Sequence, residues 1–294
     1  MSVAIDRPAA ARGPALRSLG RSAALTVGHR AAIAGYMLFA LFPLYWLAKI
    51  AITPDRLLYG EGIRLWPSST TLANFRFVLL QSDFPTFFAN SVTVSLGTAL
   101  AVTVVASGAG YAFSRFTFPG KYAVVFVLLL TQMFPLVMLI APMYRLMTPL
   151  GLTDNLLGLV IAYTAFNAPF ATFLMQSFFD SIPKELEESA MIDGCTRLQA
   201  LRRIVFPLTL PGMGATLGFV FTAAWSELLF ALMLINSEEK MTFAVGLLTF
   251  VSKFSVDWGQ MMAAGVLALI PACIFFAFIQ RYLVQGLTAG ALKG

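Results

Sequence analysis

The chain has 294 residues, of which 59% are apolar and only 12% are charged. A soluble globular domain carries about 25% charged residues, and a disordered chain combines low hydrophobicity with high charge, so the composition excludes both classes. The net charge of +6 sits in short segments between long apolar runs, which favours basic loops beside a membrane over a nucleic-acid-binding surface. Because one membrane-crossing helix needs about 20 apolar residues, the sequence predicts a membrane protein with about six spans.

In chain order, a basic segment (1–30) comes first, with five arginines against the single acid Asp6. The apolar run that follows, 31–52, is longer than the core of about 7–15 residues in a signal peptide, so we expect a retained first span. Further apolar runs predict the remaining spans at 88–113, 122–143, 155–179, 210–235 and 261–279. The expected fold is an all-α membrane protein with six transmembrane helices. The predicted transmembrane domain covers 31–294, behind a basic N-terminal arm at 1–30.

The distribution of basic residues predicts the orientation of these spans. Most of the 20 Lys and Arg residues fall in 1–30, 114–121, 181–209 and the C-terminal end. Loops rich in Lys and Arg stay in the cytoplasm. We therefore expect both termini and the loop after the fourth span to be cytoplasmic.

Two features of the spans concern packing and motion. Prolines interrupt several of them. A proline within a membrane helix leaves one backbone carbonyl without its helical partner, and a neighbouring group must satisfy it; kinked helices of this kind suit a protein with a cavity or a moving part. Prolines are, however, common in membrane helices. These prolines are Pro43, Pro135, Pro142, Pro169 and Pro271. The run 95–110 is rich in Gly, Ala and Ser, which predicts close packing against another span or subunit.

Catalytic and cofactor motifs are missing from the sequence. Gly120-Lys121 is followed by Tyr122 rather than Ser or Thr, so the chain has no phosphate-binding loop. The single histidine, His29, cannot form a zinc-protease motif, and the two cysteines are far apart. We expect no enzyme activity, no metal and no cofactor in this chain.

One acid, Glu227, lies within the fifth apolar run. Ionisable groups in lipid are costly and often functional, so Glu227 could line a solute path. A structural pairing with a neighbouring helix is the alternative, and the sequence leaves both open.

The loop 181–211 has the local signals of two short helices. Acids at 185, 187 and 188 suit a helix N-terminus, Gly194 suits the turn that ends a helix, and Thr196 with Gln199 has the spacing of a capping box. We expect Pro207 and Pro211 to end the second helix before the fifth span. Such a pair could dock on a soluble partner or rest at the lipid interface.

The same loop carries a family resemblance. Glu188-Ser189-Ala190, Asp193-Gly194 and, after nine residues, Ile204-x-Phe206-Pro207 resemble the EAA loop of the integral-membrane subunits of bacterial ABC importers. Ser189 replaces the first Ala of the family pattern and Phe206 replaces Leu. Further segments resemble the maltose-type sugar permease, namely 116–121, 133–135, 225–227 and 286–294.

This resemblance implies a type I importer fold in the bacterial cytoplasmic membrane. The implied partners are a second permease subunit, a dimer of cytoplasmic ATP-binding subunits that hold ATP and Mg, an extracytoplasmic solute-binding protein and a carbohydrate. It implies that the loop is a coupling helix that docks on the ATPase, through Glu188, Ser189, Ala190, Asp193, Gly194, Ile204 and Pro207. The candidate residues of the solute path are Phe134, Asn167, Trp225, Ser226 and Glu227.

Two alternatives remain at this stage. An importer of glycerol phosphate or another anionic solute would need an added Lys or Arg at mid-membrane. The sequence has none there, although the partner subunit could supply it. A self-sufficient secondary carrier centred on Glu227 would need no ATPase, and the docking loop argues against it.

Overall fold

A computed structural model describes residues 15–60 and 63–291. It divides into two compact units, residues 1–49 and 50–294. The first half of the predicted basic arm, including Arg7 and Arg12, lies outside the described residues. The helix α1 (Ala15–Ala51) begins within the second half of this arm and contains Pro43.

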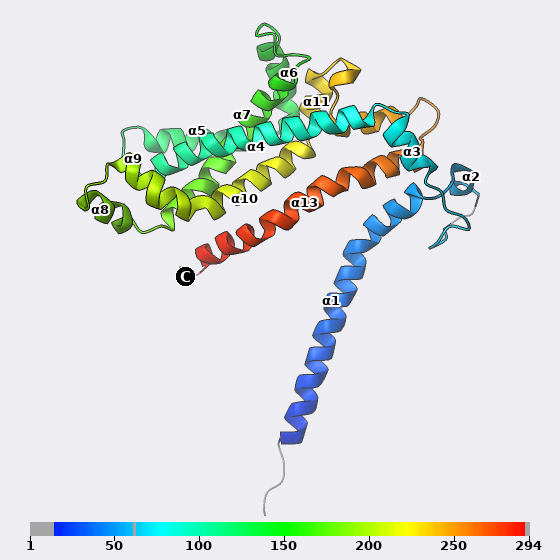
Figure 1. The fold of residues 1–294 in the computed structure, drawn as a ribbon, viewed down its shortest axis with the longest axis horizontal. Coiled ribbons are helices and arrows are strands. Elements are labelled where there is room, and N and C mark those ends of the chain that lie inside the picture. The colour runs from blue at the N-terminus through cyan, green and yellow to red at the C-terminus, as the bar shows by residue number, and fades with distance from the viewer. Residues whose placement is uncertain (1–14, 61–62, 292–294) are drawn as a thin grey trace, which may run out of the picture. The chain divides into compact units, whose positions relative to one another are not determined.

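The second unit is built from helices, and its described residues contain no β-strand apart from one isolated bridge between Val251 and Val256. Figure 1 shows α4, α7, α10 and α13 as its long elements. In chain order the helices are α2 (Asp55–Leu58), α3 (Ala73–Leu80), α4 (Phe84–Arg115), α5 (Lys121–Met133), α6 (Leu136–Met147), α7 (Leu156–Asp180), α8 (Glu185–Ile192), α9 (Arg197–Ala200), the π-helix η1 (Leu201–Val205), α10 (Phe206–Trp225), α11 (Leu229–Leu234), η2 (Glu238–Lys240), α12 (Phe243–Gly246), η3 (Leu247–Phe250) and α13 (Trp258–Ala291).

Five stretches of helix in the described residues are long and apolar enough to cross a membrane: Thr26–Ala51, Phe84–Arg115, Leu156–Asp180, Arg197–Trp225 and Trp258–Gln280. A sixth span results if α5 and α6 are counted together, although they are bent by 107°. The predicted class, an all-α membrane protein, is confirmed.

The helix of the predicted third span is broken at Phe134-Pro135. Pro135 lacks an N–H and restricts the residue before it to an extended backbone, and Phe134 has φ −75° and ψ 126°. The backbone is therefore non-helical at these two residues, and α6 begins in a new direction. The predicted fifth run is likewise interrupted, since α10 ends at Trp225 and α11 begins at Leu229.

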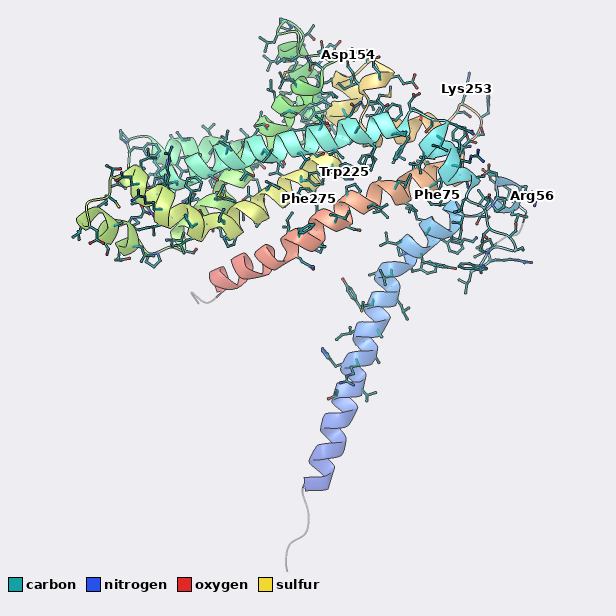
Figure 2. All side chains as sticks on the ribbon, in the orientation of Figure 1. Arg56, Phe75, Asp154, Trp225, Lys253 and Phe275 are labelled. Carbon is teal, nitrogen blue, oxygen red and sulfur yellow. The ribbon has the colours of Figure 1, made fainter. Side chains whose placement is uncertain are left out.

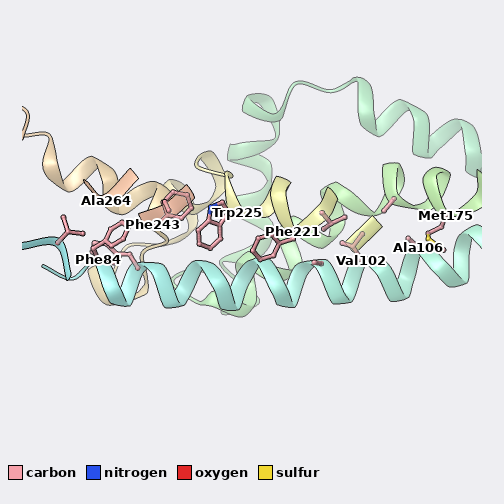
Figure 3. Close-up of a cluster of buried hydrophobic side chains, with 14 of the residues drawn as sticks. Phe84, Val102, Ala106, Met175, Phe221, Trp225, Phe243 and Ala264 are labelled. Atoms are coloured by element: carbon pink, nitrogen blue, oxygen red, sulfur yellow. The ribbon is translucent and has the colours of Figure 1, made fainter. Parts of the chain in front are cut away.

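The core of this unit follows α4. Buried side chains of α4, α7, α10 and α13 form one cluster with the short helices near residue 243, and Figure 3 shows part of it along α4 from Phe84 to Ala106. Because α4 packs mainly against α7 and α10, the expectation that 95–110 is a packing face is confirmed.

Gly110 is one of the residues on this face that allow α4 and α7 to pack closely. A Cβ atom there would lie 2.8 Å from the backbone nitrogen of Gln176 and 2.9 Å from the Cβ of Met175, both in α7. The exposed Gly108 of the same helix has no such neighbour within 4 Å.

Candidate coupling loop and solute path

The loop after α7 folds as two helices that meet at Gly194. The first helix, α8, has three acids in its first turn, where the helix dipole favours negative charge. It ends in a turn in which Gly194 takes φ +91° and its N–H donates to the Met191 carbonyl (3.1 Å). The backbone N–H of Cys195 donates to the Ala190 carbonyl (3.0 Å). The predicted hinge at Gly194 is confirmed, since a left-handed backbone suits glycine.

The second helix, α9, begins with the predicted capping box. The Gln199 N–H donates to the Thr196 hydroxyl (3.3 Å), and the Thr196 N–H donates to the Gln199 side chain (2.8 Å). The expectation that Pro207 and Pro211 end this helix is wrong, because α9 continues through η1 into α10. The π turn, in which the Phe206 N–H donates to the Leu201 carbonyl, accommodates the irregularity that a proline imposes on a helix. The loop is thus joined to α10 without an intervening coil.

The loop exposes both acidic and apolar side chains. Of the residues matched to the EAA pattern, Glu188, Ser189, Asp193, Gly194 and Pro207 are exposed, Ile204 is half-buried and Ala190 is buried. Ile192 is 86% exposed, although it is a large apolar residue at the end of α8. An exposed apolar side chain beside acids gives the loop the chemistry of a protein-docking surface.

Glu187 is the acid of this loop that is buried. Its carboxylate accepts a hydrogen bond from the Tyr111 hydroxyl (2.9 Å) and forms an ion pair with Arg115 (2.5 Å), both from the last turns of α4. Sequence reasoning missed this pairing. Arg115 and Glu187 are 72 positions apart in the sequence, so no local pattern indicates that they pair. The one usable signal is the presence of a lone Arg at the end of a predicted span.

Trp225, the first of the predicted path residues in α10, belongs to the core. It is 5% exposed and packs against Phe221 (ring centroids 5.7 Å apart), Phe88 (5.5 Å) and Phe243 (4.6 Å). Figure 2 marks its place at the end of α10, and that of Phe275 on α13. Within this chain, Trp225 therefore packs between side chains of α4, α10 and α12.

Glu227 caps the start of α11. Its carboxylate accepts hydrogen bonds from the backbone N–H groups of Leu229 (2.8 Å), Phe230 (3.1 Å) and Ala231 (3.3 Å). These are donors that a helix N-terminus leaves without an internal partner. The Ser226 hydroxyl, beside it, donates to the Thr222 carbonyl (3.0 Å) and is exposed.

Sequence neighbours of the other two predicted path residues, Gln132 and Phe166, line a small pocket. Phe134 is 56% exposed at the break between α5 and α6, and the Asn167 side chain donates to the Tyr163 carbonyl within α7 (2.8 Å). The pocket has a volume of about 160 Å³ and is lined by Thr131, Gln132, Leu139, Met143, Ala162, Ala165, Phe166 and Phe230. Thr131 and Gln132 were not singled out from the sequence, although a polar pair in an apolar run just before Met-Phe-Pro is a usable signal. The structure thus brings the neighbours of Phe134, Asn167 and Glu227 to one place, while Trp225 lies in a different cluster.

A polar clamp anchors the segment that follows α11. Asp154, in the loop before α7 (Figure 2), accepts hydrogen bonds from the Ser237 hydroxyl (2.6 Å) and from the backbone N–H groups of Ser237 (2.8 Å) and Asn236 (3.0 Å). It also pairs with Lys240 (3.0 Å). The bonds from Ser237, followed by Lys240 and Asn236, hold the pKa of Asp154 well below its ordinary value.

Comparisons with known proteins place the chain in a family of membrane transport proteins. Residues 30–289 match the family described as "Binding-protein-dependent transport system inner membrane component". The diacetylchitobiose uptake system permease protein DasC of Streptomyces coelicolor is 35% identical over 86% of this chain and 92% of its own length. The trehalose transport system permease protein SugB of Mycobacterium tuberculosis is 34% identical over 87% of this chain and 93% of its own length.

The fold has a counterpart among solved structures. A chain from a bacterial ABC transporter that imports the acidic polysaccharide alginate superposes with a TM-score of 0.73 at 25% identity, over 94% of this chain and 99% of that one. The relatives are permease subunits, which leave ATP hydrolysis to separate subunits, so the expectation that this chain is not an enzyme is confirmed. The chain belongs to the family of inner-membrane components of binding-protein-dependent ABC transport systems.

Proposed function

We propose that the chain is one of two permease subunits of an ATP-driven carbohydrate importer, and that α8 docks on a cytoplasmic ATP-binding subunit. The observation that carries the proposal is the exposed loop of α8 and α9, in which Glu188, Asp193 and Gly194 occupy the EAA pattern. The loop continues into α10 without leaving the helix. A displacement of the loop by the ATP-binding subunit would therefore displace α10 directly. An external binding protein, expected from the family's description, delivers the solute, and both termini lie in the cytoplasm.

A carbohydrate cargo is supported by the relatives of this chain. The two permease relatives carry the names of transporters for diacetylchitobiose and trehalose, and the structural relative imports alginate. The pocket beside Gln132 is smaller than the roughly 300–1,000 Å³ of a complete small-molecule site. We infer that it forms one wall of a path that the second permease completes.

Within that path, the exposed residues are the better candidates for solute contact. Phe134 is exposed and offers an aromatic face to a sugar ring, and Ser226 is exposed and offers a hydroxyl. Asn167 is half-buried and offers an amide. Trp225 and Glu227 act indirectly, by holding α10 and α11 in place.

An importer of an anionic solute is the second candidate, because alginate is acidic. An anion would be favoured by cationic side chains along its route. The residues around the pocket include none, so the second permease would have to supply them.

The test is the ATPase activity of the purified assembly in lipid, with its binding protein, against a panel of neutral and acidic sugars and polyols. We expect one class to stimulate hydrolysis, and Gly194→Pro or Glu188→Lys to abolish uptake. Gly151→Pro is the matched control for Gly194→Pro, because Gly151 also has a positive φ (+66°) and its N–H also donates to the carbonyl three residues earlier (3.1 Å).

The outcomes separate the hypotheses. Normal uptake by Gly194→Pro and Glu188→Lys would refute the coupling role of the loop. If no ATPase co-purifies and this chain alone moves solute across vesicles, the importer proposal fails and a secondary carrier replaces it.

A further inference from the structure

The ion pair between Arg115 and Glu187 is unusual because it is almost fully buried at the edge of the bundle. The two side chains are 3% and 5% exposed. Burying two charges costs free energy that only close, well-oriented partners recover. A charged pair that only increased solubility would be exposed to water. The burial of Arg115 and Glu187 therefore needs another explanation.

The pair is oriented from every side by further hydrogen bonds. Arg115 donates through Nε to Glu187, through Nη2 to the Ile182 carbonyl (3.0 Å) and through Nη1 to the Ser114 hydroxyl (2.9 Å). Ser114 in turn donates to Asp180 at the end of α7 (2.5 Å). A single guanidinium therefore links the ends of α4 and α7 to the first turn of α8.

The other helix of the loop contacts the same end of α4. The Arg197 guanidinium, at the start of α9, lies 5.1 Å from the centre of the Phe116 ring, which follows α4 directly. Phe116 packs edge-on against Tyr111 (5.9 Å), the residue that donates to Glu187. The end of α4 is itself fixed, because Lys121 donates to the Phe113 and Phe116 carbonyls.

Backbone packing does not provide this link. The backbone of α8 packs mainly against α9 and η1, so α8 reaches α4 through the long side chains of Arg115, Tyr111 and Glu187. Directional bonds between buried charges transmit a displacement better than a sliding apolar contact, because a small change of geometry forfeits their favourable energy.

We propose that Arg115 and Glu187 are positioning residues that transmit the movement of the coupling helix α8 to α4. The inference rests on the proposed function, because it assumes that an ATPase moves α8. It adds a second route for that movement: one runs along the chain through α9 and η1 into α10, and the other crosses from α8 to α4 and α7. Opening of the path then involves three spans moving together.

The experiment compares variants of the complete importer reconstituted in lipid vesicles, and measures ATP hydrolysed and solute imported in parallel. In Glu187→Gln and in the double variant Arg115→Gln/Glu187→Gln, we expect the ATPase to co-purify and hydrolyse ATP. Solute imported per ATP should fall about five- to tenfold, a change typical of coupling between sites. The double variant leaves no unpaired buried charge and so guards against simple misfolding.

Two further variants separate geometry from charge. Arg115→Lys keeps the charge but cannot reach Glu187, Ile182 and Ser114 together, so we expect the same loss of coupling. Glu239→Gln makes the same substitution as Glu187→Gln at an exposed position outside the loop of α8 and α9, and we expect the wild-type ratio of solute to ATP.

An unchanged ratio in the double variant, with the complex assembled, would overturn the proposal. Loss of ATPase binding in parallel with loss of uptake would also overturn it, since the pair would then only hold the docking surface in shape. If instead the wild-type assembly shows no solute-stimulated hydrolysis, or if Glu188→Lys couples normally, the proposed function itself has failed.

Discussion

The contact between α4 and α7 can be tested with two glycines of the same helix. Gly110→Ala places a methyl group 2.8 Å from the Gln176 nitrogen and 3.0 Å from the Met175 carbonyl carbon, both backbone atoms of α7. Backbone atoms cannot rotate away as a side chain can, so the two helices must separate. Gly108→Ala adds the same methyl group where nothing lies within 4 Å.

The size of the effect follows from the difference between the two variants. An alanine stabilises a helix by about 0.5–1 kcal/mol over glycine, and both variants gain this. Overpacking a close contact costs about 1–3 kcal/mol, and only Gly110→Ala incurs it. We therefore expect Gly110→Ala to be about 1–3 kcal/mol less stable than Gly108→Ala.

The assay is unfolding of the full-length chain in mixed micelles with increasing SDS, followed by tryptophan fluorescence. Trp225 is buried in the cluster along α4 and reports its loss. Equal midpoints for the two alanine variants would refute the close approach of α4 and α7.

Three further predictions concern single contacts. Asp154→Asn should lower the unfolding midpoint at neutral pH. Because the bonds with Ser237 and Lys240 depress the pKa of Asp154 in the folded chain below the ordinary 3.8, the wild-type advantage should be complete above about pH 5 and disappear as the pH falls below that ordinary value. A difference in midpoint that does not depend on pH would contradict this prediction. Gly194→Ala should destabilise the chain by about 1–2 kcal/mol because φ is +91° with open space around the Cβ position, measured by the same unfolding assay, and a wild-type midpoint would count against it. Glu227→Gln should accelerate hydrogen exchange at the first amides of α11 about tenfold, because losing the capping bonds costs roughly 1.4 kcal/mol of local stability. Unchanged exchange rates would show that Glu227 does not cap α11.

The parts of the loop that were predictable from the sequence depend on neighbouring residues. The hinge at Gly194 and the capping box of Thr196 with Gln199 are local, because the backbone conformation and the capping bonds involve residues within five positions of each other. The same kind of signal failed at Pro207 and Pro211. A proline marks a helix end in most contexts, and nothing local indicates that a π turn will let the helix continue.

Long-range pairings were beyond sequence reasoning. Arg115 and Glu187 are joined only because α7 returns the chain to the end of α4, and their charges do not identify each other among several acids and bases. Trp225 illustrates the same limit, since a tryptophan beside a polar pair suits a sugar path as well as a core. Burial against Phe88 and Phe243 could be read only from the structure.

If the proposed solute path passes the break between α10 and α11, the break has a consequence for selectivity. A helix interrupted along a transport route normally presents free N–H groups and a partial positive charge that attract anions. Here Glu227 already occupies those donors, so the chain supplies its own tethered anion. Any acidic solute reaching this point would have to displace a carboxylate held at millimolar or higher effective concentration, whereas a neutral sugar meets no such competitor.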